Sequence, residues 1–392
     1  MAKKRVLPAI LCVALLAAAG WYASRALTIH PAYFSAPSSI SVRLTRFCGS
    51  SPVNLELRGQ WSVKTEAGVL LLSGSDFRGV LAPDPTGLLL GARLLGRSPC
   101  ILATRGDGGI RLGDRAYTGA LRVEALSGRS GLPQDLDIVL ELSLEDYVLG
   151  VVCGEMPSSA PGIAEALKAQ AVASRTWALW KTRNSSRPLR DTTADQKFIG
   201  VDFETRAARQ AVADTRGMVL SYKGDLIPTF FHADCGGRTS DSYSVGFTHR
   251  EWPPLQGVED PDCERPFRWS RPVEAATLDG FARTHGLGDW IGHLEASSRD
   301  AGGRWLEAKL VGPSARGPFP GEDLRTGFSV PSALWQKLSV RADGSLVVSG
   351  AGHGHGVGLC QQGALRAAKK GRIHSDILEH YYPGSVVSIL GR

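Results

Sequence analysis

A glutamate, a lysine and an arginine lie in one short stretch of the chain and could together support acid–base chemistry. Glu155 lies in the segment CGEMP, just before a run of good helix formers that carries Lys168 and Arg175. Apolar neighbours raise the pKa of a carboxyl group and nearby cations lower it, so the pKa of Glu155 can be tuned for proton transfer. The alternative is a structural ion pair at a helix N-terminus, which the same residues would also form.

A long helix is predicted to follow Glu155. Apolar residues between 163 and 178 have the spacing of a buried helix face. Because the segment is rich in alanine, we expect other parts of the protein to cover the helix on all sides. Lys168 and Arg175 would then need carboxylate or ligand partners, and Glu155 is the expected one. The stretch before it should form a strand or a short helix and turn at Gly150.

Four segments occur in an order that resembles one known family. They are LEDYVLGVVCGEMP with EALKAQAVASRTWAL (144–179), DTTADQKFIG (191–200), FHADCGGRT (231–239) and GHGHGVGLCQQGA (352–364). Together they resemble the signature of the SpoIID/LytB family, with Phe198 where that family usually has tyrosine. The match of several motifs in the same order is far more specific than any one of them.

The resemblance implies a peptidoglycan lytic transglycosylase that acts on glycan strands stripped of their stem peptides. Ordinary glycosidases use two carboxylates. A lytic transglycosylase needs no external water, so one residue can act first as acid and then as base, and the resemblance assigns that role to Glu155. The alternative is a catalytically silent glycan-binding module, associated with other cell-wall hydrolases or with divisome proteins, that modulates their activity.

Further polar residues in the motifs are candidates for substrate binding. Lys168 and Arg175 are expected to bind the lactyl carboxylates or acetamido groups of the glycan. His232 is predicted to end a strand beside a Gly-Gly turn, where a ligand could approach. Hydroxyl groups of the sugar are expected to be held by Gln196, His353, His355 and Gln361.

No metal and no cofactor are expected for the reaction. A structural zinc is the alternative, since His232 and Cys235 lie close in the sequence, as do His353 and His355, and zinc accepts both residue types. A cysteine nucleophile, Cys153 or Cys360 next to a histidine, is a further alternative.

Cysteine use fits an oxidising compartment. Beyond Cys12, six cysteines remain, and pairs are expected among them. Their positions suggest Cys48 with Cys100 and Cys235 with Cys263, although a sequence does not determine connectivity.

The chain of 392 residues is expected to have a targeting segment, a linker and one large domain. Residues 1–27 combine a basic start with an apolar run, typical of a signal peptide or an uncleaved membrane anchor, and 28–40 resemble a linker. The domain, 41–392, would have a strand-rich front half (41–143) and a motif-bearing part (144–392). We therefore expect an exported α+β protein, on the outer side of the cytoplasmic membrane, with many short strands and one long helix.

The formal net charge is +7, and the basic N-terminus supplies three of these units. The remaining +4 fits an anionic wall polymer only loosely. Peptidoglycan strands are the expected partner, and nucleic acid is not.

Overall fold

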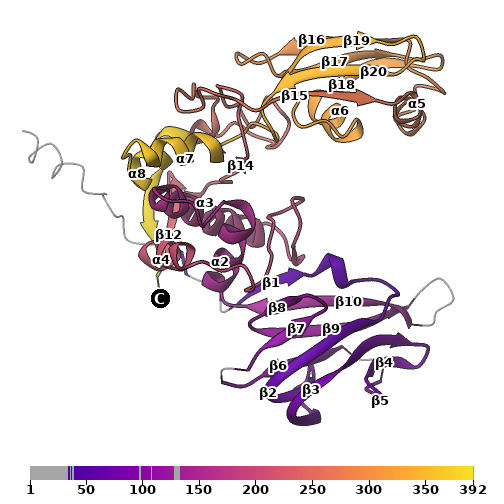
Figure 1. Cartoon of the computed structure of the whole chain (residues 1–392), viewed down its shortest axis with the longest axis vertical. Helices are drawn as coiled ribbons and strands as arrows, with labels where there is room; N and C mark the ends of the chain where they lie inside the picture. The colour runs from indigo at the N-terminus through magenta and orange to yellow at the C-terminus, as the bar shows by residue number, and fades with distance from the viewer. Residues whose placement is uncertain are drawn as a thin grey trace, which may run out of the picture.

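A computed structural model describes residues 34, 35, 37, 39–96, 99–106, 108–127 and 133–391. The predicted targeting segment, 1–27, lies outside the described residues, and so does most of the predicted linker. Among the helices that are described, none is long and apolar enough to span a membrane. The chain has an α+β fold, as predicted, with strands at both ends of the molecule and most helices between them (Figure 1).

The front of the chain forms one large, mostly antiparallel sheet with the strand order β11-β1-β10-β9-β6-β2-β3-β4-β5, and β7 joins β2 to β8. In β9 the side chains alternate between buried and half-buried, as expected for a strand with one face on the core. The strands are β1 (Ile40–Arg43), β2 (Val53–Thr65), β3 (Leu70–Asp84), β4 (Gly87–Leu90), β5 (Arg93–Leu94), β6 (Cys100–Thr104), β7 (Ile110–Leu112), β8 (Arg115–Tyr117), β9 (Ala120–Ser127), β10 (Pro133–Leu142) and β11 (Leu189–Arg190), with a 3-10 helix at Thr45–Phe47.

Helices and short strands form the middle of the molecule. Ser143 caps the first helix, since its hydroxyl accepts a hydrogen bond from the Asp146 N–H at 3.1 Å. The elements are α2 (Leu144–Glu155), α3 (Ala164–Arg183), α4 (Arg206–Asp214), β12 (Met218–Tyr222), β13 (Asp225–Leu226), β14 (Phe231–His232), a 3-10 helix at Pro253–Leu255, β21 (Leu359–Cys360), α7 (Gln361–Lys369), α8 (His374–Tyr381) and β22 (Val386–Ile389).

The predicted long helix is α3, and other elements surround it. It packs against α2, α4, α7, α8 and β12, which leaves most of its residues buried. Gly150 does not form the expected turn, because it lies inside α2. Phe198 packs closely against it, so a Cβ at this position would lie 2.4 Å from the Phe198 ring.

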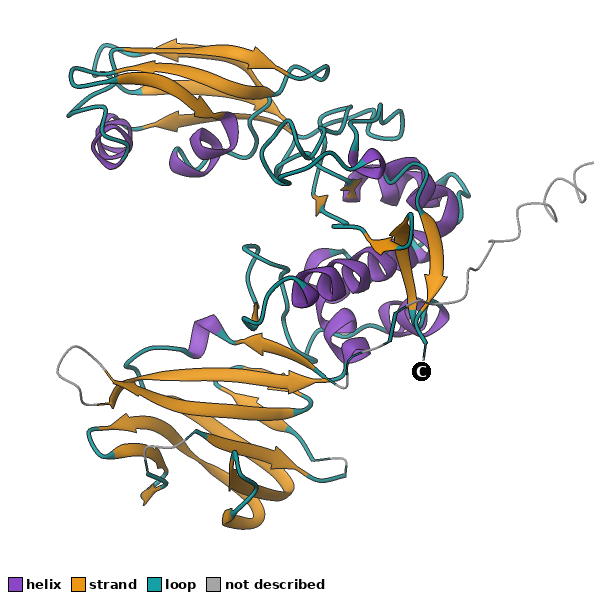
Figure 2. Ribbon diagram, turned by 180° about the vertical axis from the view of Figure 1, so that it is seen from behind, coloured by secondary structure: helices purple, strands orange, loops and turns teal. Residues whose placement is uncertain are grey.

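A third group of elements lies between the last two sequence motifs. Its strands form two three-stranded antiparallel sheets, β15-β20-β19 and β16-β17-β18, with α5 and α6 on one side of them (Figure 2). The elements are β15 (Arg268–Val273), α5 (Ala275–Thr284), β16 (His293–Arg299), β17 (Trp305–Val311), β18 (Arg316–Pro320), α6 (Gly321–Gly327), β19 (Trp335–Val340) and β20 (Leu346–Ala351).

Two hydrophobic clusters hold these parts together. The larger one runs from the front sheet into the helices, and Phe198 links them by stacking on both Tyr117 and Tyr147. The smaller cluster lies within residues 269–348 and includes Trp269, Trp305 and Trp335. The predicted boundary at residue 144 and the grouping of 41–392 as one domain stay predictions.

Candidate active site

Glu155 is the last residue of α2, and two uncharged groups hold its carboxylate. The Lys197 backbone N–H donates to Oε1 at 2.8 Å, and the Gln361 side-chain amide donates to Oε2 at 3.4 Å. Gly154 makes the first contact possible, because a Cβ there would lie 2.2 Å from the Lys197 carbonyl oxygen. The end of α2, the segment 191–200 and the start of α7 therefore meet at one carboxyl group.

The surroundings of Glu155 favour its neutral form. Burial raises the pKa of this carboxyl above its ordinary value of 4.5, and the hydrogen bonds from Lys197 and Gln361 oppose the shift only in part. Throughout the described part of the chain, no lysine or arginine forms an ion pair with it. A half-buried carboxyl of this kind can deliver a proton at a pH where an exposed glutamate has already lost it.

A cavity of about 390 Å³ opens beside Glu155. It brings together six of the eight residues predicted from the sequence for catalysis or substrate binding. Besides Glu155, these are Gln196, His232, His353, His355 and Gln361.

His232 lines this cavity, and one of its ring nitrogens is unprotonated. Its Nδ1 lies 3.0 Å from the Val357 carbonyl oxygen, which can only accept, so Nδ1 carries the proton. Its Nε2 is buried, and among the described residues it has no hydrogen-bond partner. Burial, helped by the charge of Arg304, lowers the pKa of His232 to about 3, so the ring stays neutral and Nε2 is a free acceptor.

The two histidines of the Gly-rich segment, His353 and His355, differ in burial and in their contacts. His355 is half-buried, and its Nδ1 accepts a hydrogen bond from the Val357 N–H at 3.0 Å. Burial and the neighbouring His232 ring hold the pKa of His355 well below its usual range. His353 is exposed at the rim, where its ring lies 5.9 Å from that of Phe267. Both line the cavity, but His355 is fixed in place and His353 is accessible.

The two glutamines have largely structural contacts. The Gln196 side-chain oxygen accepts a hydrogen bond from the buried Tyr147 hydroxyl at 2.9 Å, and its amide group lies 3.5 Å from the Ser174 carbonyl. The Gln361 amide is shared between Glu155 and the side chain of Gln170. Gln361 therefore orients Glu155, whereas Gln196 fixes the segment 191–200 against α2 and α3.

Lys168 and Arg175 do not line the cavity, and neither pairs with Glu155. Lys168 forms ion pairs with Glu165 at 2.9 Å and Asp214 at 3.0 Å. These contacts correct the expectation that Lys168 faces the substrate, because α3 turns this position toward α4.

Arg175 is fully buried and forms a bidentate pair with Glu145, whose oxygens lie 2.9 and 2.6 Å from its guanidinium nitrogens. It also donates to the Met218 carbonyl at 3.1 Å. Arg175 therefore joins α2, α3 and β12, and the structure leaves it no access to a ligand. Its expected role in substrate binding is corrected to a structural one.

Several cavity residues were not expected from the sequence. Arg325 and Glu322 come from α6, where they form an ion pair at 2.5 Å. Asp195 precedes Gln196 and is paired with Arg190. A sequence signal existed for Arg325, since the segment 312–330 resembles a family segment in which Gly321, Leu324 and Arg325 fit. Aromatic walls come from Trp177, Phe230, Phe231 and Phe247.

Neither predicted disulfide is present. Cys48, Cys235 and Cys263 carry free thiols. The Cys48 thiol lies 3.3 Å from the Leu44 carbonyl oxygen and 3.5 Å from the Asp137 carboxylate. Cys235 and Cys263 do come close in space, as their predicted pairing requires, but they share their surroundings with other polar groups.

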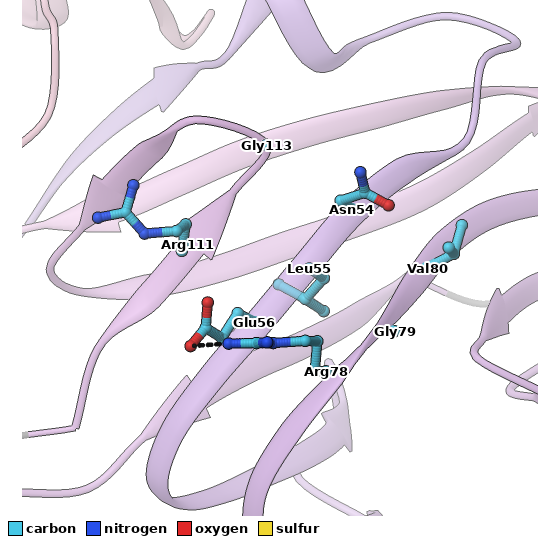
Figure 3. Close-up of a pocket in the computed structure, with 8 residues that line it drawn as sticks. All are labelled: Asn54, Leu55, Glu56, Arg78, Gly79, Val80, Arg111 and Gly113. Carbon is cyan, nitrogen blue, oxygen red and sulfur yellow. Dashed lines mark hydrogen bonds and ion pairs between the residues drawn. The ribbon is translucent and has the colours of Figure 1, made fainter.

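A second cavity, also of about 390 Å³, lies on the front sheet (Figure 3). Its walls come from β2, β3 and β7, and Glu56 and Arg78 form an ion pair there at 3.2 Å. None of the predicted site residues lines it. The cavity beside Glu155 is therefore the candidate active site.

Comparisons with known proteins agree with the motif resemblance. The family described as Stage II sporulation protein (SpoIID) matches residues 133–222, which include α2, α3 and Glu155. An uncharacterized protein of Brachyspira hyodysenteriae is 32% identical over 256 residues, which are 63% of this chain and 67% of that protein.

Two relatives from Bacillus subtilis are similar in the same way. Stage II sporulation protein D is 29% identical over 279 residues, 64% of this chain and 76% of that protein. The amidase enhancer is 29% identical over 289 residues, and the match covers 61% of this chain but only 40% of the enhancer. From the motifs, the family match and these relatives we conclude that the chain belongs to the SpoIID family.

Proposed function

We propose that the protein is an exported, cell-wall-active enzyme, a lytic transglycosylase that cleaves the bond between N-acetylmuramic acid and N-acetylglucosamine in glycan strands. The observation that carries this proposal is Glu155, a carboxyl with a raised pKa, held by two uncharged donors beside a cavity with aromatic walls. The membership of the protein in the SpoIID family supports the same reaction.

In the first step Glu155 acts as the general acid. Its neutral carboxyl donates a proton to the glycosidic oxygen as the bond from that oxygen to the anomeric carbon of the muramic residue breaks. The leaving N-acetylglucosamine residue departs as an alcohol, and positive charge develops on the muramic ring. Gln361 keeps the carboxyl aimed in one direction through its hydrogen bond to Oε2.

In the second step the same carboxylate acts as the base. It accepts the proton of the 6-hydroxyl of the muramic residue, whose oxygen bonds to the anomeric carbon and closes a 1,6-anhydro ring. Glu155 regains its proton, so no water is consumed and no second carboxylate is required. The hydrogen bonds from Lys197 and Gln361 stabilise the charged form between the two steps.

Two other residues are proposed to position the sugar. The free Nε2 of His232 can accept a hydrogen bond from a sugar hydroxyl. Arg325 can bind the lactyl carboxylate of a muramic residue, the role first expected of Lys168 and Arg175. Aromatic side chains such as Trp177 and Phe247 provide apolar surface for the faces of the sugar rings.

The test is mass spectrometry of the products formed from peptide-stripped glycan strands. The wild-type chain should release fragments with 1,6-anhydro-muramic ends, and Glu155→Gln should lower turnover by roughly 10²–10⁴-fold with glycan binding retained. The exposed Glu259, whose side chain is 85% accessible, provides the matched control, and Glu259→Gln should behave as the wild type. Products with reducing ends would instead indicate hydrolysis by water.

A second function is a silent glycan-binding module that modulates another wall enzyme. The name of one relative, amidase enhancer, favours it. Under this alternative Glu155→Gln would leave both glycan binding and stimulation of a wall amidase unchanged, and the wild-type chain would release no fragments.

A further inference from the structure

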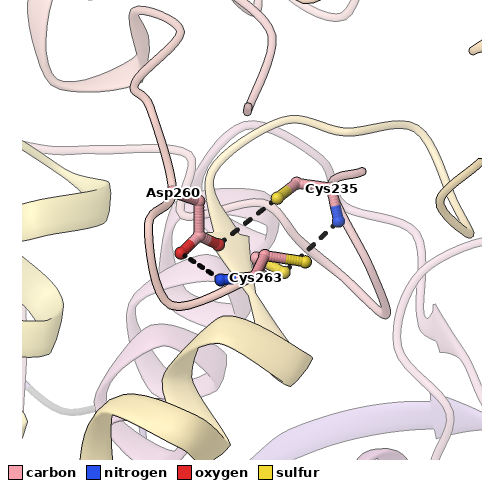
Figure 4. Close-up of side chains that lie close together, drawn as sticks. Cys235, Asp260 and Cys263 are labelled. Atoms are coloured by element: carbon pink, nitrogen blue, oxygen red, sulfur yellow. Dashed lines mark hydrogen bonds between the residues drawn. The ribbon is translucent and has the colours of Figure 1, made fainter. Parts of the chain in front are cut away.

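Three cysteines and one aspartate from distant parts of the chain come together near the active-site cavity, since Gln361, which lines it, directly follows Cys360. Cys235 follows β14, and Asp260 and Cys263 lie in one turn (Figure 4). Cys360 ends β21. All four are buried, and their three sulfur atoms and one carboxylate oxygen lie within 4.8 Å of one another. The mechanism proposed above uses none of them.

The donor set fits one particular kind of ion. Zinc in structural sites binds four ligands in a tetrahedron, and three thiolates with one carboxylate supply four donor atoms. Zinc–sulfur bonds of about 2.3 Å place neighbouring sulfur atoms about 3.8 Å apart in such a tetrahedron. The Cys235 sulfur lies 3.3 Å from Asp260 Oδ2, and all four donor atoms lie within 4.8 Å of one another, which is compatible with ligands of one ion.

The surroundings of the sulfur atoms also resemble those of metal-bound thiolates. The Gly237 N–H points to the Cys235 sulfur at 3.3 Å. The Cys235 and Gly363 N–H groups point to the Cys360 sulfur at 3.3 and 3.4 Å, the latter from the first turn of α7. Backbone N–H groups at a helix start stabilise negative charge. Sulfur is a weak acceptor when it is a thiol, so these donors suit thiolates better.

Hydrogen bonds also hold the carboxylate of Asp260 in one orientation. Tyr381 donates its hydroxyl hydrogen to Asp260 Oδ2 at 2.8 Å, and the Asp262 and Cys263 N–H groups donate to Oδ1 at 3.1 Å. Gly363 leaves room for this arrangement, because a Cβ there would lie 2.0 Å from the Tyr381 hydroxyl oxygen. Such outer hydrogen bonds fix the ligand geometry of metal sites.

A disulfide does not account for the whole cluster. Three thiols allow one disulfide and leave one buried cysteine beside a buried carboxylate. A metal ion uses all four groups at once, and it also neutralises part of the charge that burial makes costly. The buried Arg304, which donates to the Cys235 carbonyl at 3.1 Å, adds positive charge near the cluster.

From this geometry we propose that Cys235, Asp260, Cys263 and Cys360 bind one zinc ion in a closed structural site. Binding releases the three thiol protons to solvent, and no electron transfer is involved. With all four positions filled by the protein, the ion has no place for water or substrate, so it does not act in the cleavage step.

The position of the site gives the ion a structural role for the neighbouring cavity. Cys360 is followed directly by Gln361, which holds Glu155, and β14 pairs with β21 so that His232 lies opposite Cys360. An ion at this point would fix the start of α7, the Gly-rich segment and the strand that carries His232 relative to one another. This proposal is independent of which reaction Glu155 performs.

Metal content and spectroscopy test the site on the full chain. The wild-type chain, purified without chelator and then dialysed, should hold about one zinc ion per molecule by mass spectrometry of metals. After zinc removal under reducing conditions, Co²⁺ should give thiolate-to-metal charge-transfer absorption and the visible bands of a tetrahedral ion. Both measurements use the wild-type chain, so misfolding of a variant cannot affect them.

Variants then assign the ligands. Cys263→Ser and Asp260→Asn should weaken zinc binding by at least tenfold, whereas Cys48→Ser, which alters a free thiol on the front sheet, should not. The proposal is overturned if the reduced chain takes up no zinc, or if the cobalt spectrum is unchanged in Cys263→Ser. A Cys235–Cys263 disulfide in the protein isolated from its own cells would overturn it too.

Discussion

At the scale of single residues, Glu155 differs from three other acidic side chains discussed above, because no ion pair among the described residues includes it. Asp195, Glu322 and Glu145 all pair with arginines, and an ion pair favours the charged carboxylate. Glu155 instead accepts from a backbone N–H and an amide, and burial dominates its protonation. The paired carboxylates hold elements of the fold together, whereas burial raises the pKa of Glu155 above its ordinary value.

This difference predicts how stability changes with pH. Because the folded-state pKa of Glu155 is raised above 4.5, the folded protein binds more protons than the unfolded chain between 4.5 and that raised value. The contribution of Glu155 to stability is present in full below pH 4.5 and is lost as the pH rises through the folded-state pKa. The Gln side chain of Glu155→Gln does not titrate. As the pH rises from 4.5 through the folded-state pKa, the melting temperature of this variant should therefore increase relative to that of the wild type, as thermal unfolding at a series of pH values would show. An unchanging difference would mean that Glu155 has an ordinary pKa.

Arg175 and Lys168 should affect stability very differently. Arg175→Ala leaves Glu145 without its partner in the interior and should cost about 3–5 kcal/mol of unfolding free energy. Lys168→Ala, in a partly exposed ion pair, should cost only about 0.2–1 kcal/mol. Denaturant unfolding of the two variants measures both changes in unfolding free energy. Loss of glycan affinity in Lys168→Ala at unchanged stability would restore the substrate-binding role first expected of that residue.

At the scale of elements, the end of α2 must approach the segment 191–200 very closely. Two glycines on α2 permit this approach: Gly150 lies under the Phe198 ring, and Gly154 lies against the Lys197 carbonyl. Inside a helix glycine costs about 1 kcal/mol relative to alanine. The two glycines therefore lower the intrinsic stability of α2. In return, the segment 191–200, which donates to Glu155, can lie directly on the surface of this helix.

Gly154→Ala should therefore harm the site although alanine favours a helix. The new Cβ would push the segment 191–200 away and break the hydrogen bond from Lys197 to Glu155, a bond that lowers the pKa of that carboxyl. We expect lower turnover and a basic limb of the pH–rate profile shifted to higher pH. Gly280, in α5, is the matched control: no atom lies within 4 Å of its Cβ position, so Gly280→Ala should stabilise the protein by up to about 1 kcal/mol. An unshifted profile in Gly154→Ala would show that the contact is not required.

At the scale of the whole molecule, the cavity combines residues from both hydrophobic clusters. Glu155 belongs to an element of the larger cluster, and Arg325 belongs to α6, which packs in the smaller one. The group of elements between residues 268 and 351 is thus part of the site, although it interrupts the sequence between two of the motifs.

Arg325→Ala should show what this group contributes. If Arg325 binds a lactyl carboxylate, its loss removes hydrogen bonds to a charged group, worth about 1.5–3 kcal/mol, so KM for peptide-stripped glycan should rise tenfold or more with kcat little changed. Oligomers of N-acetylglucosamine, which lack the carboxylate, are the control ligand, and their affinity should not change. An equal loss of affinity for both ligands would contradict the assignment.

How much the sequence predicts depends on how local each feature is. The helix α3 and the strands of the front sheet followed from short patterns of residue types. The residues singled out in the motifs, Glu155, Gln196, His232, His353, His355 and Gln361, line one cavity, and their roles stay predictions. The partners of Lys168 and Arg175 could not be derived, because Asp214 and Glu145 lie on other elements whose packing no periodicity reveals. Arg325 was not expected at the cavity, because the resemblance of its segment does not show which other elements it packs beside.

The hydrogen bond between Gln361 and Glu155 joins residues 206 positions apart, and this separation has a consequence for timing. A chain emerges from the ribosome with its N-terminus first, so α2 and α3 exist long before α7. Until the final stretch is synthesised and docks, Glu155 lacks this partner, and both His353 and His355 are absent from the cavity. The cavity is therefore incomplete until the last motif has been synthesised, and we expect a chain cut short before residue 352 to release no glycan fragments.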